Sequence, residues 1–169
     1  MLSLSLFIIG SIFGSFYNVC IYRLPNDLDV ISKRSFCTTC KYKIPFYLNV
    51  PIISYILNLG KCKNCKSKIN ISYLVVEILT AILFVYAYSL YGLNVKTLAY
   101  IIFYSGLLII FFTDLKYYLI LDKITIPLSV LGLIFTFFNH NPFDVNIFSS
   151  IIGGVIGYLI IYIIRFLFF

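Results

Sequence analysis

Residues 37–65 have the sequence CTTCKYKIPFYLNVPIISYILNLGKCKNC, which contains two Cys-x-x-Cys pairs at its ends. Two residues between cysteines let both thiols turn toward one point, and two such pairs are typical of a tetrahedral four-thiolate site. The spacing predicts that one structural zinc ion is bound by Cys37, Cys40, Cys62 and Cys65. Disulfides or free thiols are the alternatives.

The chain around this segment is strongly apolar. Hydrophobic residues make up 62% of the 169 residues and charged residues 11%, and the mean hydropathy is +1.02. Soluble domains are roughly half apolar and a quarter charged, so this composition excludes an ordinary soluble domain. We expect an all-α polytopic membrane protein in contact with the lipid bilayer. The net charge of +7 follows membrane topology, so we expect no nucleic-acid partner.

Five apolar runs approach the roughly 20 residues that a spanning helix needs. They cover about residues 2–22, 73–91, 95–113, 124–138 and 147–168. The fourth run is the shortest, and its helix could begin as early as Tyr118. We therefore expect a first transmembrane helix in residues 1–24, a four-cysteine loop in residues 25–72 and a membrane domain of four helices in residues 73–169. No internal repeat is expected.

Basic residues predict the orientation in the membrane. Nine of the 13 lysines and arginines lie between the first two apolar runs: Arg23, Lys33, Arg34, Lys41, Lys43, Lys61, Lys63, Lys66 and Lys68. Lysine and arginine are retained on the cytoplasmic side, so we expect a cytoplasmic zinc-ribbon-like loop and an outside N-terminus in a multi-pass protein. The cytoplasm keeps thiols reduced, which favours metal ligands over disulfides.

Ionisable groups beside hydrocarbon are costly and usually functional. Asp114 ends the third apolar run, Asp122 precedes the fourth, and Glu77 lies just inside the second. In an aspartic protease two carboxylates share one proton. Asp114 is the main candidate for such a pair, whereas Asp122 is a weaker one because the intervening loop or helix start need not hold the two in contact. The alternative is that both aspartates mark the membrane boundary and cap the next helix.

Two other residues have simpler interpretations. His140, beside Asn141 and Pro142, is expected to be a turn residue. Cys20, within the first apolar run, is expected to be a small buried hydrophobic residue. Neither is predicted to belong to a functional site.

Several motifs, in one order along the whole chain, resemble those of bacterial prepilin peptidases, the type IV leader peptidases and N-methyltransferases. They are Gly14-Ser-Phe-Tyr-Asn-Val19 with Tyr22-Arg-Leu-Pro25, the cysteine-rich loop with residues 49–55 and 71–77, and Thr113-Asp-Leu115 with Asp122-Lys-Ile-Thr-Ile-Pro127. The glycine-rich strip of residues 153–157 resembles the family's glycine-rich span, which lies a little before its last motif. Leu121 stands where the family has proline.

The resemblance implies a bacterial cytoplasmic (inner) membrane enzyme. Such an aspartic endopeptidase cleaves the leader of type IV prepilins or pseudopilins on the cytoplasmic side, and the family also N-methylates the new N-terminus from S-adenosylmethionine. No residue of a methyl-donor site is identified. The alternative is a non-enzymatic membrane anchor whose zinc knuckle docks assembly partners.

The family's first catalytic aspartate corresponds to Asp114. Its second lies in a GxGD motif that this chain lacks, so we expect the C-terminal part of the family's membrane domain to be missing. One carboxylate cannot act as acid and base in the same step. We therefore expect weak or absent cleavage by residues 1–169 alone.

Overall fold

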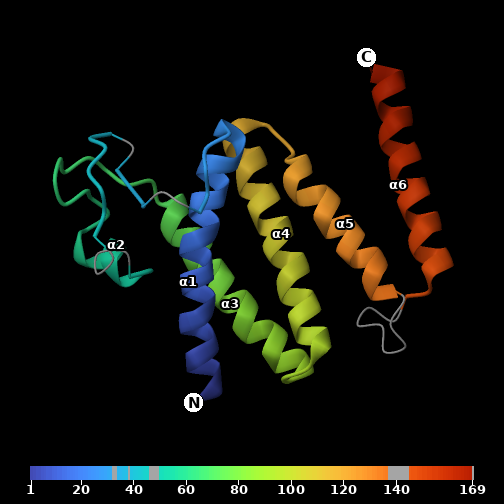
Figure 1. Cartoon of the computed structure of the whole chain (residues 1–169), viewed down its shortest axis with the longest axis horizontal. Helices are drawn as coiled ribbons and strands as arrows, with labels where there is room; N and C mark the ends of the chain where they lie inside the picture. Colours follow the sequence, from blue (N-terminus) through green and yellow to red (C-terminus); the bar gives the residue numbers. More distant parts are fainter. Residues whose placement is uncertain (32–33, 38, 46–49, 137–144, 169) are drawn as a thin grey trace. The chain divides into compact units, whose positions relative to one another are not determined.

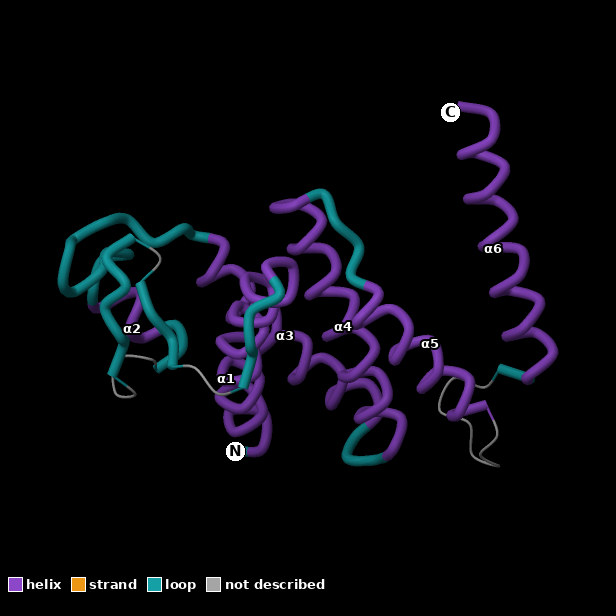
Figure 2. Tube along the Cα trace, turned by 45° about the horizontal axis from the view of Figure 1, so that its top comes forward, coloured by secondary structure: helices purple, strands orange, loops and turns teal. Residues whose placement is uncertain are grey.

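The computed structural model describes residues 1–31, 34–37, 39–45, 50–136 and 145–168, and His140 lies outside these ranges. Its helices are α1 (Leu2–Arg23), η1 (Leu24–Asn26), α2 (Ile53–Leu57), α3 (Ser72–Tyr91), α4 (Val95–Tyr117), α5 (Asp122–Thr136) and α6 (Ile147–Phe168). Within the described ranges there are helices and loops but no strands, as Figure 2 shows. The predicted all-α class is confirmed.

The five long helices occupy the five predicted spans. Among the described residues, three segments are long and apolar enough to cross a membrane by length and composition: Leu2–Asn26, Ser72–Tyr91 and Val95–Tyr117. Helix α5 has 15 residues, and Ile147–Ile160 of α6 is a shorter apolar stretch. The chain is therefore a multi-pass membrane protein, with a number of spans close to that expected.

The chain folds as two compact units, Met1–Thr125 and Ile126–Phe169. The first unit contains α1, α3, α4, the four-cysteine loop and the beginning of α5. In this unit α1 packs against α3 and α4, and the loop with α2 follows α1 along the chain (Figure 1). The second unit contains the rest of α5 and α6. The expected division at residues 24 and 72 stays a prediction.

Two glycines let α1 approach α3 closely. A Cβ on Gly10 would lie 2.8 Å from the Cα of Ala81, and a Cβ on Gly14 would lie 2.7 Å from the Cα of Glu77. Residues four apart share one helix face, so the pair forms a flat strip against which the α3 backbone packs. Such small-xxx-small spacing is a common basis of helix association in membranes.

The core of this unit joins all three long helices. Tyr17, Cys20 and Ile21 of α1 pack with Val76 of α3 and Ile109 of α4. Only 6% of the Cys20 surface is exposed, which confirms the expectation of a small buried residue. This packing fixes the ends of α1, α3 and α4 next to the four-cysteine loop.

Candidate metal centre and the cavity beside it

The structure brings the four cysteines of the loop together. The Sγ atoms of Cys37, Cys40, Cys62 and Cys65 all lie within 4.8 Å of one another, and those of Cys37 and Cys65 are 3.9 Å apart. Tetrahedral zinc with Zn–S bonds of about 2.3 Å requires sulfurs about 3.8 Å apart. The donor set and its dimensions therefore fit one tetrahedral metal ion.

A tight turn presents the first cysteine pair. The N–H of Cys37 donates to the carbonyl of Tyr42 and the N–H of Lys41 donates to the carbonyl of Cys37, both at 2.9 Å. Phe36 and Lys43 close the turn with an isolated antiparallel bridge. Lys41, directly after the second cysteine, has φ of 58°, so the chain reverses there and aims both thiols toward the same side.

The second cysteine pair is folded in the same way. Cys62 donates to Ser67 at 2.9 Å, and Lys66, with φ of 58°, donates to Cys62 at 3.0 Å. The described residues of 35–44 correspond to residues 60–69 in hydrogen bonding and bridge position. The expectation of no internal repeat is therefore wrong, because a shared Cys-x-x-Cys-Lys-x-Lys pattern encodes two equivalent turns.

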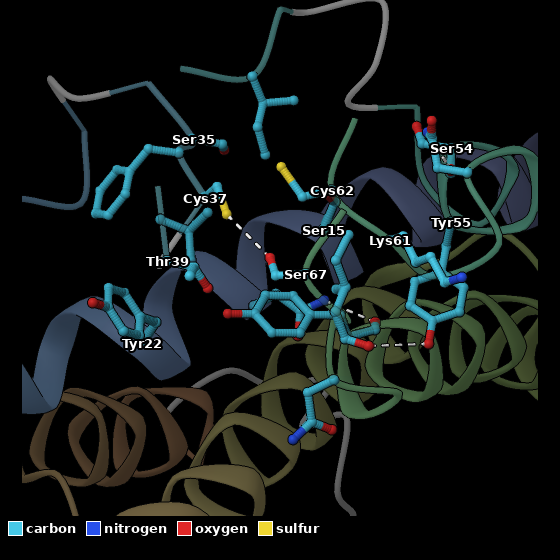
Figure 3. Close-up of a pocket in the computed structure, with 18 of the residues that line it drawn as sticks. Ser15, Tyr22, Ser35, Cys37, Thr39, Ser54, Tyr55, Lys61, Cys62 and Ser67 are labelled. Atoms are coloured by element: carbon cyan, nitrogen blue, oxygen red, sulfur yellow. Dashed lines mark hydrogen bonds between the residues drawn. The ribbon is translucent and has the colours of Figure 1, made fainter. Parts of the chain in front are cut away.

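Hydrogen bonds favour the thiolate form of Cys37 and Cys65. The pKa of the Cys37 thiol is lowered from 9.0 to about 6, mainly by the backbone N–H of Cys40 that donates to its sulfur. The Ser67 hydroxyl lies 3.0 Å from the Cys65 sulfur and is the main cause that lowers the pKa of Cys65. The same hydroxyl lies 3.8 Å from the Cys37 sulfur (Figure 3). Thiolates are the metal-binding form of cysteine.

A cavity of about 450 Å³ lies beside the metal centre. Its walls come from α1, the four-cysteine loop, the start of α3 and the end of α4, and Figure 3 shows several of these side chains. The lining is rich in tyrosine and in basic residues: Tyr22, Tyr42, Tyr55, Tyr73, Tyr117, Arg23, Lys61, Lys63, Lys68 and Lys116. This volume falls in the range of small-molecule sites, which are about 300–1,000 Å³.

Arg23, at the end of α1, holds the start of the loop in place. Its side chain is 3% exposed, and its guanidinium donates to the carbonyls of Asp29 at 2.9 Å and Arg34 at 3.0 Å. It also lies 5.8 Å from the centre of the Phe36 ring. The sequence associated Arg23 with topology and with the Tyr22-Arg-Leu-Pro25 motif. Its role as an anchor of the loop was missed because its acceptors are backbone carbonyls, which have no sequence signature.

Among the described residues that line this cavity, Glu77 is the one with a carboxylate. It is 9% exposed, and its Oε2 accepts a hydrogen bond of 2.7 Å from the N–H of Ile52. The Ser15 hydroxyl of α1 is a second hydrogen-bond partner. Glu77 therefore fixes Ile52, whose φ is 62°, over the start of α3.

The two aspartates lie at opposite kinds of helix end. Asp114 is exposed in the last turn of α4, and its backbone carbonyl accepts from Tyr118 at 2.8 Å. Asp122 is exposed at the first residue of α5. Neither lines the 450 Å³ cavity. The predicted metal ligands thus converge, whereas the predicted catalytic aspartate lies apart from them at the end of α4.

The fold and site define a class, a multi-pass helical membrane protein with a candidate four-thiolate metal centre between its first two long helices. Residues 8–91 match the model of the bacterial peptidase A24 N-terminal domain, and residues 101–169 match that of the type IV leader peptidase family. The chain belongs to the type IV leader peptidase family.

Relatives named prepilin leader peptidase/N-methyltransferase match most of the chain. The Vibrio cholerae protein is 37% identical over 95% of this chain and 65% of its own length. The Bacillus subtilis protein is 34% identical over 97% of this chain and 64% of its own length. The Klebsiella pneumoniae protein is 33% identical over 91% of this chain and 69% of its own length. The chain thus spans about two thirds of the length of these relatives. No solved structure matches the chain.

Proposed function

We propose that this chain is a membrane aspartic endopeptidase for type IV prepilin-like proteins, in which Asp114 supplies a catalytic carboxylate. The observation that carries this proposal is the place of Asp114 in the last turn of α4. The C-terminal end of a helix carries partial negative charge, which disfavours a carboxylate there by about 0.3–1 kcal/mol. Helix stability therefore gives no account of Asp114, and this supports a functional role for its carboxylate.

Asp122 has a sufficient structural explanation. It is in the first turn of α5, where the positive end of the helix dipole stabilises a carboxylate. We therefore leave Asp122 out of the catalytic pair. In the proposed chemistry one carboxylate takes a proton from water while its protonated partner polarises the scissile carbonyl.

The proposed setting is the cytoplasmic face of the bacterial inner membrane. The excess of basic residues between α1 and α3 supports a cytoplasmic loop, and Asp114 then lies on the same side after two further crossings. Prepilins and pseudopilins are the proposed substrates. Their apolar helix would remain in the bilayer while the leader is cut at the membrane surface.

Zinc is the proposed metal of the four-cysteine site. All ligands are sulfur, and the dimensions fit a tetrahedral ion. A site with four protein ligands leaves no open position for water. The proposed role of zinc is therefore to hold the two turns together rather than to catalyse.

A second activity, N-methyl transfer, is supported by the 450 Å³ cavity. S-adenosylmethionine would supply a methyl group on a positively charged sulfur when bound. The tyrosine rings of the cavity offer flat faces to an adenine ring and attraction to a sulfonium. The basic side chains on its wall would bind the carboxylate of the donor.

A chimera tests the peptidase proposal. Residues 1–169 replace the corresponding part of the Vibrio cholerae relative, and the product is expressed with a prepilin whose shortening is followed on a gel. We expect cleavage that is abolished by Asp114→Asn and retained with Asp122→Asn. Residues 1–169 alone serve as a second test. Robust cleavage by them that Asp122→Ala abolishes would show that Asp122 is the partner and our assignment wrong.

The chimera also discriminates the anchor alternative. A chimera that is inserted in the membrane and retains its metal but cuts no prepilin would favour a non-enzymatic docking role. The metal content is measured on the same preparation, so that misfolding is recognised independently of activity.

A further inference from the structure

Glu77 is a buried carboxylate in the wall of the 450 Å³ cavity, where the other charged lining residues are lysines and an arginine. In the part of the chain that the structure describes, no ion pair is formed by Glu77, and its partners are the N–H of Ile52 and the hydroxyl of Ser15. Burying a carboxylate without a cation is costly. Such a group in a cavity is a candidate for binding a positively charged ligand.

The carboxylate has unused hydrogen-bonding capacity. Two carboxylate oxygens offer about four acceptor positions, and the two known partners occupy only part of them. The cavity supplies the space, because Glu77 belongs to its lining. A ligand amine could therefore bind Glu77 without displacing Ile52.

Position in the helix restricts the kind of amine. Glu77 lies five residues after Ser72, the first residue of α3, so it is about 7.5 Å along the helix axis from that end. A small soluble ammonium ion could bind equally well at the end of the helix, so this position does not favour it. An amine attached to an apolar segment that lies in the bilayer would arrive at this level.

The cavity also adjoins the end of α4. A second cavity of about 210 Å³ shares Asn18, Tyr73 and Lys116 with the first, and it is lined further by Phe112 and Leu115 of α4. These last two residues flank Asp114 in the sequence, within one or two positions. An amine released near the end of α4 would therefore lie close to the second cavity, which shares wall residues with the cavity that Glu77 lines.

We propose that Glu77 binds the free N-terminal amine of an apolar peptide, and that it is the acceptor-binding residue for the N-methyl transfer proposed above. The carboxylate takes the proton that an ammonium must lose before its nitrogen can act as a nucleophile. The proton passes from nitrogen to a Glu77 oxygen, the N–H bond breaks, and its electron pair stays on nitrogen. The proton then leaves to solvent. This inference rests on the proposed methyl transfer for its purpose but not for its binding test.

The test is binding of a peptide amide, Leu-Leu-Val-Leu-amide, to the purified chain in detergent, by calorimetry. We expect the peptide with a free N-terminus to bind about 10- to 100-fold more tightly than its N-acetylated form, as charged hydrogen bonds of this kind do. Glu77→Gln should remove this preference while retaining an oxygen that accepts from Ile52. Equal binding of both peptides to the unmodified chain would overturn the inference whether or not the variant folds.

Three readouts separate the possible failures. Metal content of Glu77→Gln equal to that of the unmodified chain shows that the loop is folded. S-adenosylhomocysteine should bind the variant and the unmodified chain alike, and weaker binding to the variant would place Glu77 at the donor instead and overturn the inference. If the peptide with a free amine is preferred but no methyl transfer occurs, the proposed N-methyl transfer alone is contradicted. If Glu77→Gln transfers methyl groups as well as the unmodified chain does, the proposed role of Glu77 alone is contradicted.

Discussion

A Cβ on Gly14 of α1 would lie 2.7 Å from the Cα of Glu77 of α3. The same contact that closes the helix pair therefore positions the carboxylate of the cavity. Asn18, one turn further along α1, donates from its Nδ2 to the carbonyl of Tyr73 at 2.9 Å. Both contacts are made to the backbone of α3, so they hold the α3 residues that line the cavity at a fixed distance from α1.

Gly14→Ala should destabilise the protein by about 1–3 kcal/mol, because a methyl group in a filled interface forces the backbones apart. The measurement is thermal unfolding in detergent. Gly132→Ala is the matched control, since a Cβ there meets no described atom within 4 Å and alanine favours the helix. Equal unfolding temperatures for the two variants would contradict the close packing of α1 on α3.

The long helices could be predicted from the sequence because the length of an apolar run decides whether it spans a bilayer. The start of α5 at Asp122 fell within the range left open between Tyr118 and residue 124. The cysteine cluster could be predicted because each pair carries its own geometry in its spacing. The length of an apolar run and the spacing of a cysteine pair are local properties of the sequence, so they can be recognised without knowing which helices pack together.

The packing of the helices could not be predicted in the same way. The close approach of α1 to α3 uses Gly10 and Gly14. A glycine pair shows that close approach is possible but does not name the partner helix. The Glu77–Ile52 hydrogen bond and the cavity depend on the same tertiary contact, so neither was available from the sequence.

Arg23→Lys should lower the free energy of unfolding by about 1.5–3 kcal/mol, because one ammonium cannot reproduce hydrogen bonds to two carbonyls from a fixed fork. Thermal unfolding and hydrogen exchange of residues 29–31 are the measurements. Arg34→Lys is the control, since the Arg34 side chain is exposed. Unchanged exchange in Arg23→Lys would show that the loop does not depend on this anchor.

Asp114→Asn should leave the protein as stable as before or up to about 1 kcal/mol more stable, since it removes a negative charge from a helix C-terminus. Asp122→Asn should have the opposite effect at the start of α5. Both are measured at low salt, where such charge effects are least screened. A loss of stability in Asp114→Asn would indicate a structural role and weaken its assignment to catalysis.

Cys37→Ser and Cys62→Ser should each remove the metal, because a structural four-thiolate site depends on all its ligands. The purified protein is expected to contain about one zinc per chain, measured by elemental analysis. Cys20→Ala is the control, since Cys20 belongs to the helix core and not to the cluster. Metal retained in both serine variants would disprove the proposed centre.

Alkylation of Cys37 in the chelator-treated protein should reach half its maximal rate near pH 6, the value to which its pKa is lowered. The thiolate is the reactive form, and the N–H of Cys40 stabilises it only while the first turn is folded. Because the folded pKa lies below the ordinary value, this stabilisation is present at high pH and is lost as the pH falls through about 6. The measurement is iodoacetamide labelling across a pH series, with Cys37 quantified by mass spectrometry. The urea-unfolded chain is the control and should give a midpoint between about 8.5 and the ordinary value of 9.0. A midpoint in this range in the native protein as well would mean that the turn does not persist without its metal, contrary to this expectation.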